Sequence, residues 1–152
     1  MKTKILSFFL LLTFVLLFCG AFALRAGSGT LPDLVVTSVK FEKVRQLYDA
    51  QKRPYWLFNV YVTLLNQDKA PAGKFQMLLV RNIGAGGSEV QACTSCWPWV
   101  DGLNPGQYLT LGPFQFNNAG GLGCTFSAKA DYPDNVVESN ERNNTSTATF
   151  TE

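Results

Sequence analysis

The stretch WLFNVYVTLL, which runs from Trp56 to Leu65, decides the fold class because it has the period of two that a half-buried β-strand requires. One side of the extended chain carries only large apolar side chains, those of Phe58, Val60, Val62 and Leu64. The other side includes the polar residues Asn59 and Thr63. This alternation predicts the central strand of an antiparallel sheet that packs one face against a core.

Short runs of the same kind lie on both sides of this strand, separated by Gly, Pro and Asn. They occupy residues 33–41, 74–82, 88–92, 109–111, 124–131 and 144–151. Pro113 interrupts the run that begins at Leu109 and predicts an edge strand or a bend there. Since no stretch has the period of a helix, we expect an all-β fold, an antiparallel β-sandwich of about seven strands.

The first residues have the pattern of an export signal, because Lys2 and Lys4 precede a nearly unbroken apolar run that is followed by small residues. We expect residues 1–23 to be a signal peptide, residues 24–31 a short linker, and residues 32–152 a single sandwich domain. The apolar run has about 20 residues, so an uncleaved membrane anchor is the alternative. The expected location is secreted, at the cell surface or in the periplasm.

Four motifs give the sequence a resemblance to a known family. They are LPDLVV (31–36), LNQDKAPAGKF (65–75), LNPGQ (103–107) and KADYPDNVVESNERNN (129–144), of which the last is the most specific. In this order they resemble the CARDB domain, a cell-adhesion-related module of bacteria and archaea, over roughly Leu31 to Thr151. The resemblance implies an immunoglobulin-like β-sandwich exported to the surface. The stretch from Lys43 to Pro54 and the cysteines do not belong to the family pattern.

The chain has no histidine, which removes the usual general base and every Ser/His/Asp or Cys/His arrangement. A pair of carboxylates could still act as in a glycosidase, but no spacing in the sequence identifies such a pair. We therefore expect a protein that is not an enzyme.

The charge balance limits the partners. The full chain has 13 Lys and Arg against 11 Asp and Glu, and loss of the predicted signal removes two lysines, which leaves no net charge. Phosphate binding needs a clustered positive field, so we expect no nucleic acid partner, and membrane contact only through an uncleaved N-terminal segment. One basic and aromatic cluster, interpreted as a solvated loop, contains Lys43, Arg45, Lys52 and Arg53 near Tyr48, Tyr55 and Trp56.

Cys93, Cys96 and Cys124 remain after removal of the predicted signal, and an oxidising space favours a disulfide between two of them. Cys124 shares a strand face with Phe126 and should point inward. We expect a bridge to Cys124 from Cys96, or from Cys93 in the alternative, that clamps a loop to the sandwich. The spacing of CTSC also occurs in zinc and redox sites, but the sequence supplies neither a fourth zinc ligand nor a following helix.

Trp97 and Trp99 lie two residues apart, so in an extended segment both rings face the same way. An exposed pair could stack on sugar rings and bind a carbohydrate. Large aromatic side chains more often pack against the core, however, and this is the expected role of both residues and of Trp56.

The segment from Asp131 to Asn144 is rich in carboxylates and amides. The carboxylates of Asp131, Asp134, Glu138 and Glu141 are of the type that binds calcium, although their spacing is not that of an EF-hand. Asp and Asn also close turns by accepting hydrogen bonds from nearby backbone N–H groups. Turn formation is the main interpretation, and no cofactor other than possible calcium is expected.

Together these features predict a secreted or surface-bound, non-catalytic β-sandwich that binds a protein or polysaccharide partner. Two alternatives stay open: a carbohydrate-binding accessory module that uses Trp97 and Trp99, and a domain that calcium stabilises.

Overall fold

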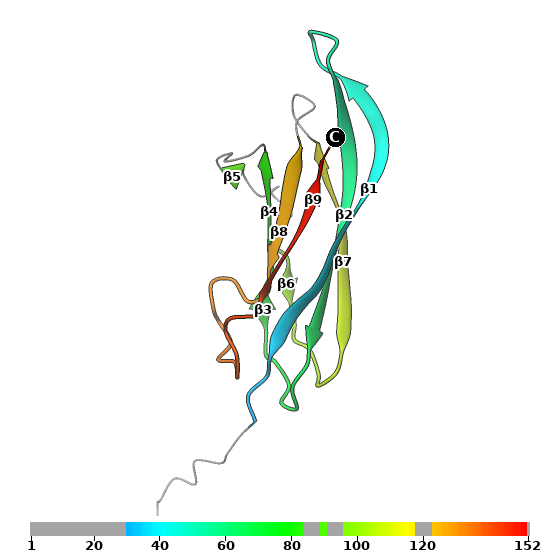
Figure 1. Ribbon diagram of the computed structural model, residues 1–152. Coiled ribbons are helices and arrows are strands. Elements are labelled where there is room, and N and C mark those ends of the chain that lie inside the picture. Colours follow the sequence, from blue (N-terminus) through cyan, green and yellow to red (C-terminus); the bar gives the residue numbers. More distant parts are fainter. Residues whose placement is uncertain (1–29, 84–88, 91–95, 118–122, 152) are drawn as a thin grey trace, which may run out of the picture.

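The computed structural model describes residues 30–83, 89–90, 96–117 and 123–151, so the predicted signal at 1–23 and most of the linker lie outside them. Two sheets face each other (Figure 1). One contains β1 (Leu34–Tyr48), β2 (Pro54–Asn66) and β7 (Tyr108–Asn117), in the order β1-β2-β7. The other contains β4 (Leu78–Ile83), β5 (Glu89–Val90), β8 (Cys124–Lys129) and β9 (Thr145–Phe150), in the order β5-β4-β8-β9. The short strands β3 (Phe75–Gln76) and β6 (Trp99–Val100) pair with each other.

Every strand pairing is antiparallel, and the described part of the chain contains no helix. The predicted antiparallel β-sandwich is therefore confirmed. It follows that no described helix is long and apolar enough to cross a membrane.

The core lies between the sheets and is built from the alternating positions that the sequence indicates. In β2 the inward side chains of Phe58, Val60, Val62 and Leu64 are fully buried. The ring of Phe58 lies 5.9 Å from that of Phe126 on β8 and 5.1 Å from that of Phe150 on β9, which joins the two sheets. Full burial of one such side chain stabilises the fold by about 1.5–3 kcal/mol.

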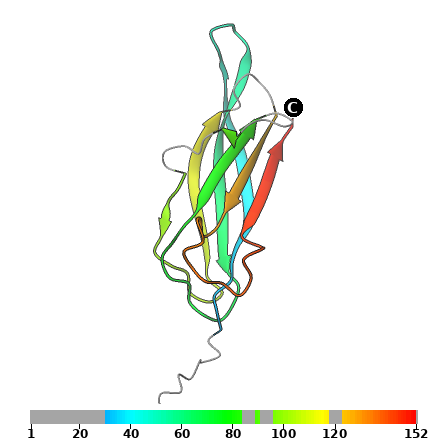
Figure 2. The same cartoon turned by 90° about the vertical axis from the view of Figure 1, so that its left-hand side faces the viewer.

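The stretch from Lys43 to Pro54, interpreted above as a solvated loop, is mostly β-structure, and this interpretation is wrong. β1 continues to Tyr48, which pairs with Pro54 at the start of β2. The side chains are exposed, as expected of a loop, but the backbone groups pair between the two strands. The paired strands β1 and β2 therefore extend past the rest of the sandwich as a hairpin (Figures 1 and 2).

Strand β7 is the edge strand that Pro113 predicts, because β2 is its only partner among the described residues. The strand continues through Pro113 with a shift in register opposite Val60 to Val62. Gly112 makes this shift possible, since its φ is +120° and a Cβ there would lie 2.6 Å from the carbonyl oxygen of Val60.

The predicted disulfide to Cys124 is wrong. Cys124 points inward as expected, with 2% of its surface exposed, but it is a free thiol whose pKa is raised by burial. In the backbone pairing of β4 with β8, Cys124 lies opposite Ile83. The backbone oxygen of Cys96 accepts from the N–H of Leu79, which lies four residues before Ile83 on β4. Four residues of strand span about 13 Å, which exceeds the reach of a disulfide. Cys96 is disulfide-bonded, and Cys93 lies outside the described residues.

Candidate ligand-binding surface at Trp97, Trp99 and Tyr132

Backbone hydrogen bonds hold the segment from Cys96 to Val100 beside β3 and the start of β4, with a bend at Cys96 and Trp97 before β6 begins at Trp99. Trp99 pairs with Gln76 of β3, and the carbonyl oxygen of Pro98 accepts from the N–H of Met77 at 3.1 Å. Cys96 and Val100 are buried, whereas Trp97 and Trp99 are 47% and 56% exposed. Both indoles are therefore exposed, and the expectation that they pack against the core is wrong.

Trp56 behaves differently from the other two tryptophans. It is partly buried and packs against the core at the start of β2. The expectation of packing therefore holds for Trp56, because its strand position points toward the second sheet.

Tyr132 adds a third ring, which the sequence reasoning missed. It belongs to the connection between β8 and β9, and its N–H donates to the carbonyl oxygen of Gln76 at 2.8 Å. Its ring lies 5.7 Å from that of Trp97, with an angle of 70° between the ring planes. We call Trp97, Trp99 and Tyr132 the aromatic platform. Sequence spacing could not have found this contact, since 35 positions separate the two rings along the chain.

Polar side chains surround the aromatic platform. The ammonium of Lys74 lies 5.3 Å from the ring centre of Trp99 and 3.8 Å from a carboxylate oxygen of Asp101. The amide of Gln76 donates to the carbonyl oxygen of Trp97 at 2.9 Å. Rings flanked by donors and acceptors can bind a ligand that has both apolar faces and hydroxyl groups.

The other side of the platform has a similar pair of charges. Lys129 lies 6.0 Å from the ring centre of Tyr132, and its ammonium donates to Asp134 at 2.7 Å. Each cation near the platform is therefore balanced by a carboxylate, so this surface has no strong net charge.

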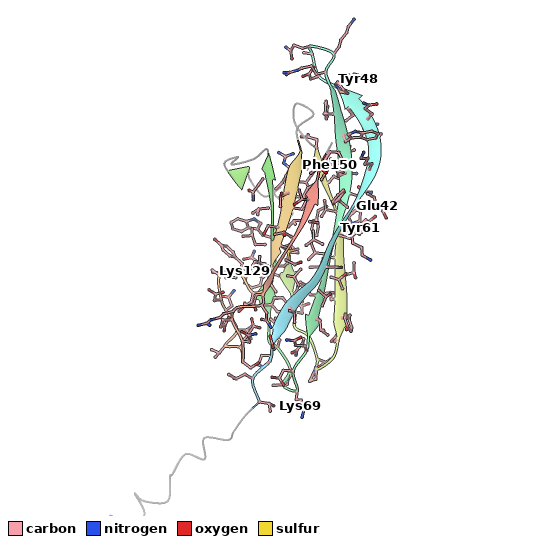
Figure 3. The ribbon with its side chains drawn as sticks, in the orientation of Figure 1. Glu42, Tyr48, Tyr61, Lys69, Lys129 and Phe150 are labelled. Atoms are coloured by element: carbon pink, nitrogen blue, oxygen red, sulfur yellow. The ribbon has the colours of Figure 1, made fainter. Side chains whose placement is uncertain are left out.

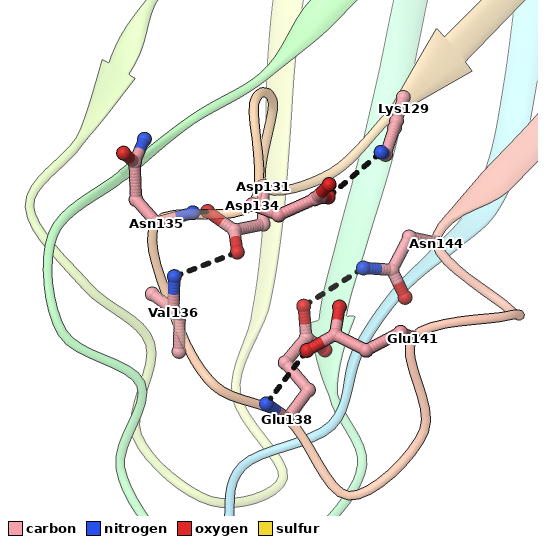
Figure 4. A network of polar contacts seen from close by, with 8 residues as sticks. All are labelled: Lys129, Asp131, Asp134, Asn135, Val136, Glu138, Glu141 and Asn144. Carbon is pink, nitrogen blue, oxygen red and sulfur yellow. Dashed lines mark hydrogen bonds and ion pairs between the residues drawn. The ribbon is translucent and has the colours of Figure 1, made fainter.

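The four predicted calcium ligands lie in the connection between β8 and β9, where hydrogen bonds within the chain hold them (Figure 4). Asp131 is fully buried, and its two carboxylate oxygens accept from the N–H groups of Asn135 at 3.0 Å and Val136 at 2.8 Å. Asp134 binds Lys129 instead. Asp131 and Asp134 have positive φ, 48° and 73°, as expected of turn residues.

Glu138 ties this connection to the first strand. Its carboxylate accepts from the N–H of Leu34 and, at 2.8 Å, from the side-chain amide of Asn144. The N–H of Glu138 itself donates to Glu141 at 2.9 Å. Burial raises the pKa of Glu138 to about 7, although the bonds from Leu34 and Asn144 oppose the shift.

These contacts agree with the turn-forming interpretation of the acidic segment. Among the residues that the structure describes, no group of three or more His, Cys, Asp or Glu side chains is arranged to hold a metal ion. Calcium binding by Asp131, Asp134, Glu138 and Glu141 stays a prediction.

No protein-family model matches the chain, and no curated protein matches it. Among solved structures, a domain of a provisionally named cell surface protein from Methanosarcina acetivorans covers 80% of this chain and 92% of its own, with 22% sequence identity and a TM-score of 0.56. The CARDB domain of a Pyrococcus furiosus protein, crystallised in complex with di-metal ions, covers 80% and 93% of the two chains, with 22% identity and a TM-score of 0.47.

The similarity to the Methanosarcina acetivorans domain extends over most of both chains, so it concerns the whole sandwich rather than a single hairpin. At 22% identity it is a similarity of fold. The chain thus shares the fold of the Methanosarcina acetivorans domain, an antiparallel β-sandwich of two facing sheets.

Proposed function

We propose that this protein is a non-catalytic module of the cell surface that binds a polysaccharide through the aromatic platform. The observation that carries the proposal is the position of Trp97 and Trp99, which are both about half exposed. Burial of a large apolar side chain is favourable by about 1.5–3 kcal/mol, so two neighbouring exposed indoles forgo this stabilisation unless a ligand covers them.

A polysaccharide fits the chemistry of this surface. A sugar ring has an apolar face of C–H groups that can pack on an aromatic ring, and hydroxyl groups that can bond to amides and charged groups. Trp97 and Trp99 are two residues apart in the chain and both are exposed, so neighbouring sugar units of one polymer can meet the two indoles. Gln76, Lys74 and Asp101 supply hydrogen-bonding groups beside the rings.

The surface location rests on two supports. The predicted signal at residues 1–23 favours export, and the Methanosarcina acetivorans protein with the same fold is provisionally named a cell surface protein. The non-catalytic role rests on the lack of histidine in the sequence and on the fold.

Titration calorimetry with a panel of neutral polysaccharides tests the proposal. For a polysaccharide that binds, Trp97→Ala and Trp99→Ala should each weaken the affinity about tenfold or more, because each removes one stacking ring. Binding should also shift the tryptophan emission of the unmodified protein.

Tyr108→Ala is the matched control, because Tyr108 is 64% exposed on β7, in the other sheet. This variant should bind as the unmodified protein does. If the two tryptophan variants bind every polysaccharide as tightly as the Tyr108 variant, the platform is not the binding site and the proposal fails.

A further inference from the structure

The hairpin of β1 and β2 continues past the end of the sandwich. Strand β7 pairs with β2 only as far as Leu57, which lies opposite Asn117. Beyond this point, among the described strands, β1 and β2 pair only with each other, up to Tyr48 and Pro54. In Figures 1 and 2 this part rises beyond the ends of the other labelled strands. We call the segment from Lys43 to Leu57 the projecting arm.

The turn at the end of the projecting arm is fixed by Asp49. Its carboxylate accepts from the backbone N–H groups of Gln51 at 2.9 Å and Arg53 at 2.8 Å. The same carboxylate forms an ion pair of 2.6 Å with the guanidinium of Arg53. Lys52 occupies the left-handed region with a φ of 61°. The arm is therefore an ordered element whose negative charge at the turn is already paired with Arg53.

Positive charge is concentrated on this part of the chain. Residues 40–57 contain five basic and two acidic residues, whereas the remainder of the chain after residue 29 contains five basic and nine acidic residues. Among the described residues, Arg45 and Lys52 form no ion pair. Lys43 lies 4.7 Å from the ring centre of Trp56 and the same distance from that of Phe150. The arm thus presents cations that no carboxylate of the described chain balances.

Aromatic rings accompany these cations. Tyr48 is 64% exposed and lies near the end of the arm (Figure 3). Gln46 pairs with Trp56 and lies two residues before Tyr48, so the side chains of Tyr48 and Trp56 are on the same face of the ribbon. Arg45 pairs with Leu57 and therefore lies on the opposite face of the ribbon, and Lys52 lies in the turn between the two faces. A polymer that wraps around the end of the arm can pack a sugar ring on Tyr48 while Arg45 and Lys52 bind its acidic groups.

We propose that the projecting arm binds an anionic polysaccharide, a polymer that contains uronic acid units. A membrane fits less well, because the turn from Asp49 to Arg53 has no large apolar side chain to enter a bilayer. Nucleic acid also fits less well, because the nine acidic residues that lie outside residues 40–57 would repel a polymer with one charge per phosphate. This second surface lies at the far end of the molecule from the loop that carries Lys69 (Figure 3) and does not include the aromatic platform.

The test measures binding of the full chain to polygalacturonate, to dextran and to phosphatidylglycerol vesicles. We expect binding to polygalacturonate that weakens about tenfold between 20 and 300 mM salt, because exposed ion pairs are screened. The double variant Arg45→Gln with Lys52→Gln should weaken this binding about tenfold, and Tyr48→Ala should weaken it about threefold. Dextran, which has no charge, should not bind to the arm.

The matched control is the double variant Lys69→Gln with Arg142→Gln, which removes the same charge from exposed positions outside the arm. It should bind polygalacturonate within about twofold of the unmodified protein. An equal loss in both double variants would mean that only the total charge matters and would overturn the proposal. Binding to vesicles but not to polygalacturonate would also overturn it.

Discussion

Glu138 shows how one buried carboxyl group couples the fold to pH. Its ordinary pKa of 4.5 is raised to about 7 in the folded chain, chiefly because burial disfavours the charged form. Between these two pH values the native state holds a proton that the unfolded chain has released. The resulting stabilisation is complete below about pH 4.5 and is lost as the pH rises through 7. Its upper limit is about 3 kcal/mol.

We expect Glu138→Gln to remove this pH dependence. Glutamine cannot ionise, and its amide can donate to Asn144, whose Oδ1 is buried and has no hydrogen-bond partner in the described chain. Urea unfolding at pH 5 and pH 8 should show a drop of about 2–3 kcal/mol in the unmodified protein and a much smaller drop in the variant. Asp134→Asn, a change of an exposed carboxylate in the same connection that binds Lys129 and not Glu138, should keep the full drop. Equal pH dependence in the unmodified protein and the Glu138 variant would contradict this account.

Arg81 marks the limit of sequence reasoning at the level of a residue. Phe75, Met77 and Leu79 alternate inward as predicted, and Arg81 continues the same face with only 9% of its surface exposed. Its guanidinium donates to the backbone and side-chain oxygens of Asn117 at the end of β7. The alternation of inward and outward side chains along β4 predicts that Arg81 points inward, whereas its charge favours exposure to solvent. The sequence does not show that Asn117 lies close enough to accept hydrogen bonds from the buried guanidinium.

At the level of elements, the connection between β8 and β9 depends on Asp131. The buried carboxylate satisfies two backbone N–H groups of the turn, which would otherwise be left without partners. We expect Asp131→Ala to lower the free energy of unfolding by about 2–4 kcal/mol, measured by urea unfolding at pH 5. Asp134→Asn keeps a residue that tolerates the positive φ of 73°, removes only the charge of an ion pair at the surface, and should cost about 1 kcal/mol or less. Similar losses in the two variants would show that the turn does not depend on the Asp131 bonds.

The sequence predicted those strands whose apolar residues alternate and missed those whose pattern is interrupted. β2 and β8 were evident because one face of each is continuously apolar. The outer half of β1 has no such pattern, because charged and polar residues interrupt the apolar positions from Lys43 to Tyr48. β6 has only two residues, and its place beside β3 arises from backbone pairing that leaves no periodic signal.

The candidate site was predictable only in part. The sequence singles out Trp97 and Trp99 as a candidate pair, but large aromatic side chains are usually buried, and this general tendency favours the core. Exposure follows from the inward position of Cys96 and Val100, which the sequence does not fix. Tyr132 joins the platform through a connection far away in the sequence, so only the folded chain reveals it.

At the scale of the whole molecule, calcium and its removal test whether the acidic connection needs a metal. Asp131, Asp134, Glu138 and Glu141 have hydrogen-bonding or ion-pair partners within the chain, so we expect the melting temperature to be the same with calcium and with EDTA. A rise in melting temperature with calcium that Glu138→Ala abolishes would instead support a domain that calcium stabilises. Calorimetry at fixed pH measures both cases.

The continuity of β1 has a mechanical consequence. This single strand runs from Leu34, beside the point where the chain enters the fold, to Tyr48 near the end of the projecting arm (Figure 1). Its 15 residues span about 50 Å. A force applied near Tyr48 is therefore transmitted along the covalent backbone of β1 to Leu34. The two sheets need not move relative to each other to transmit this force. A tether at the base and a load at the tip would leave the sandwich itself largely free of tension.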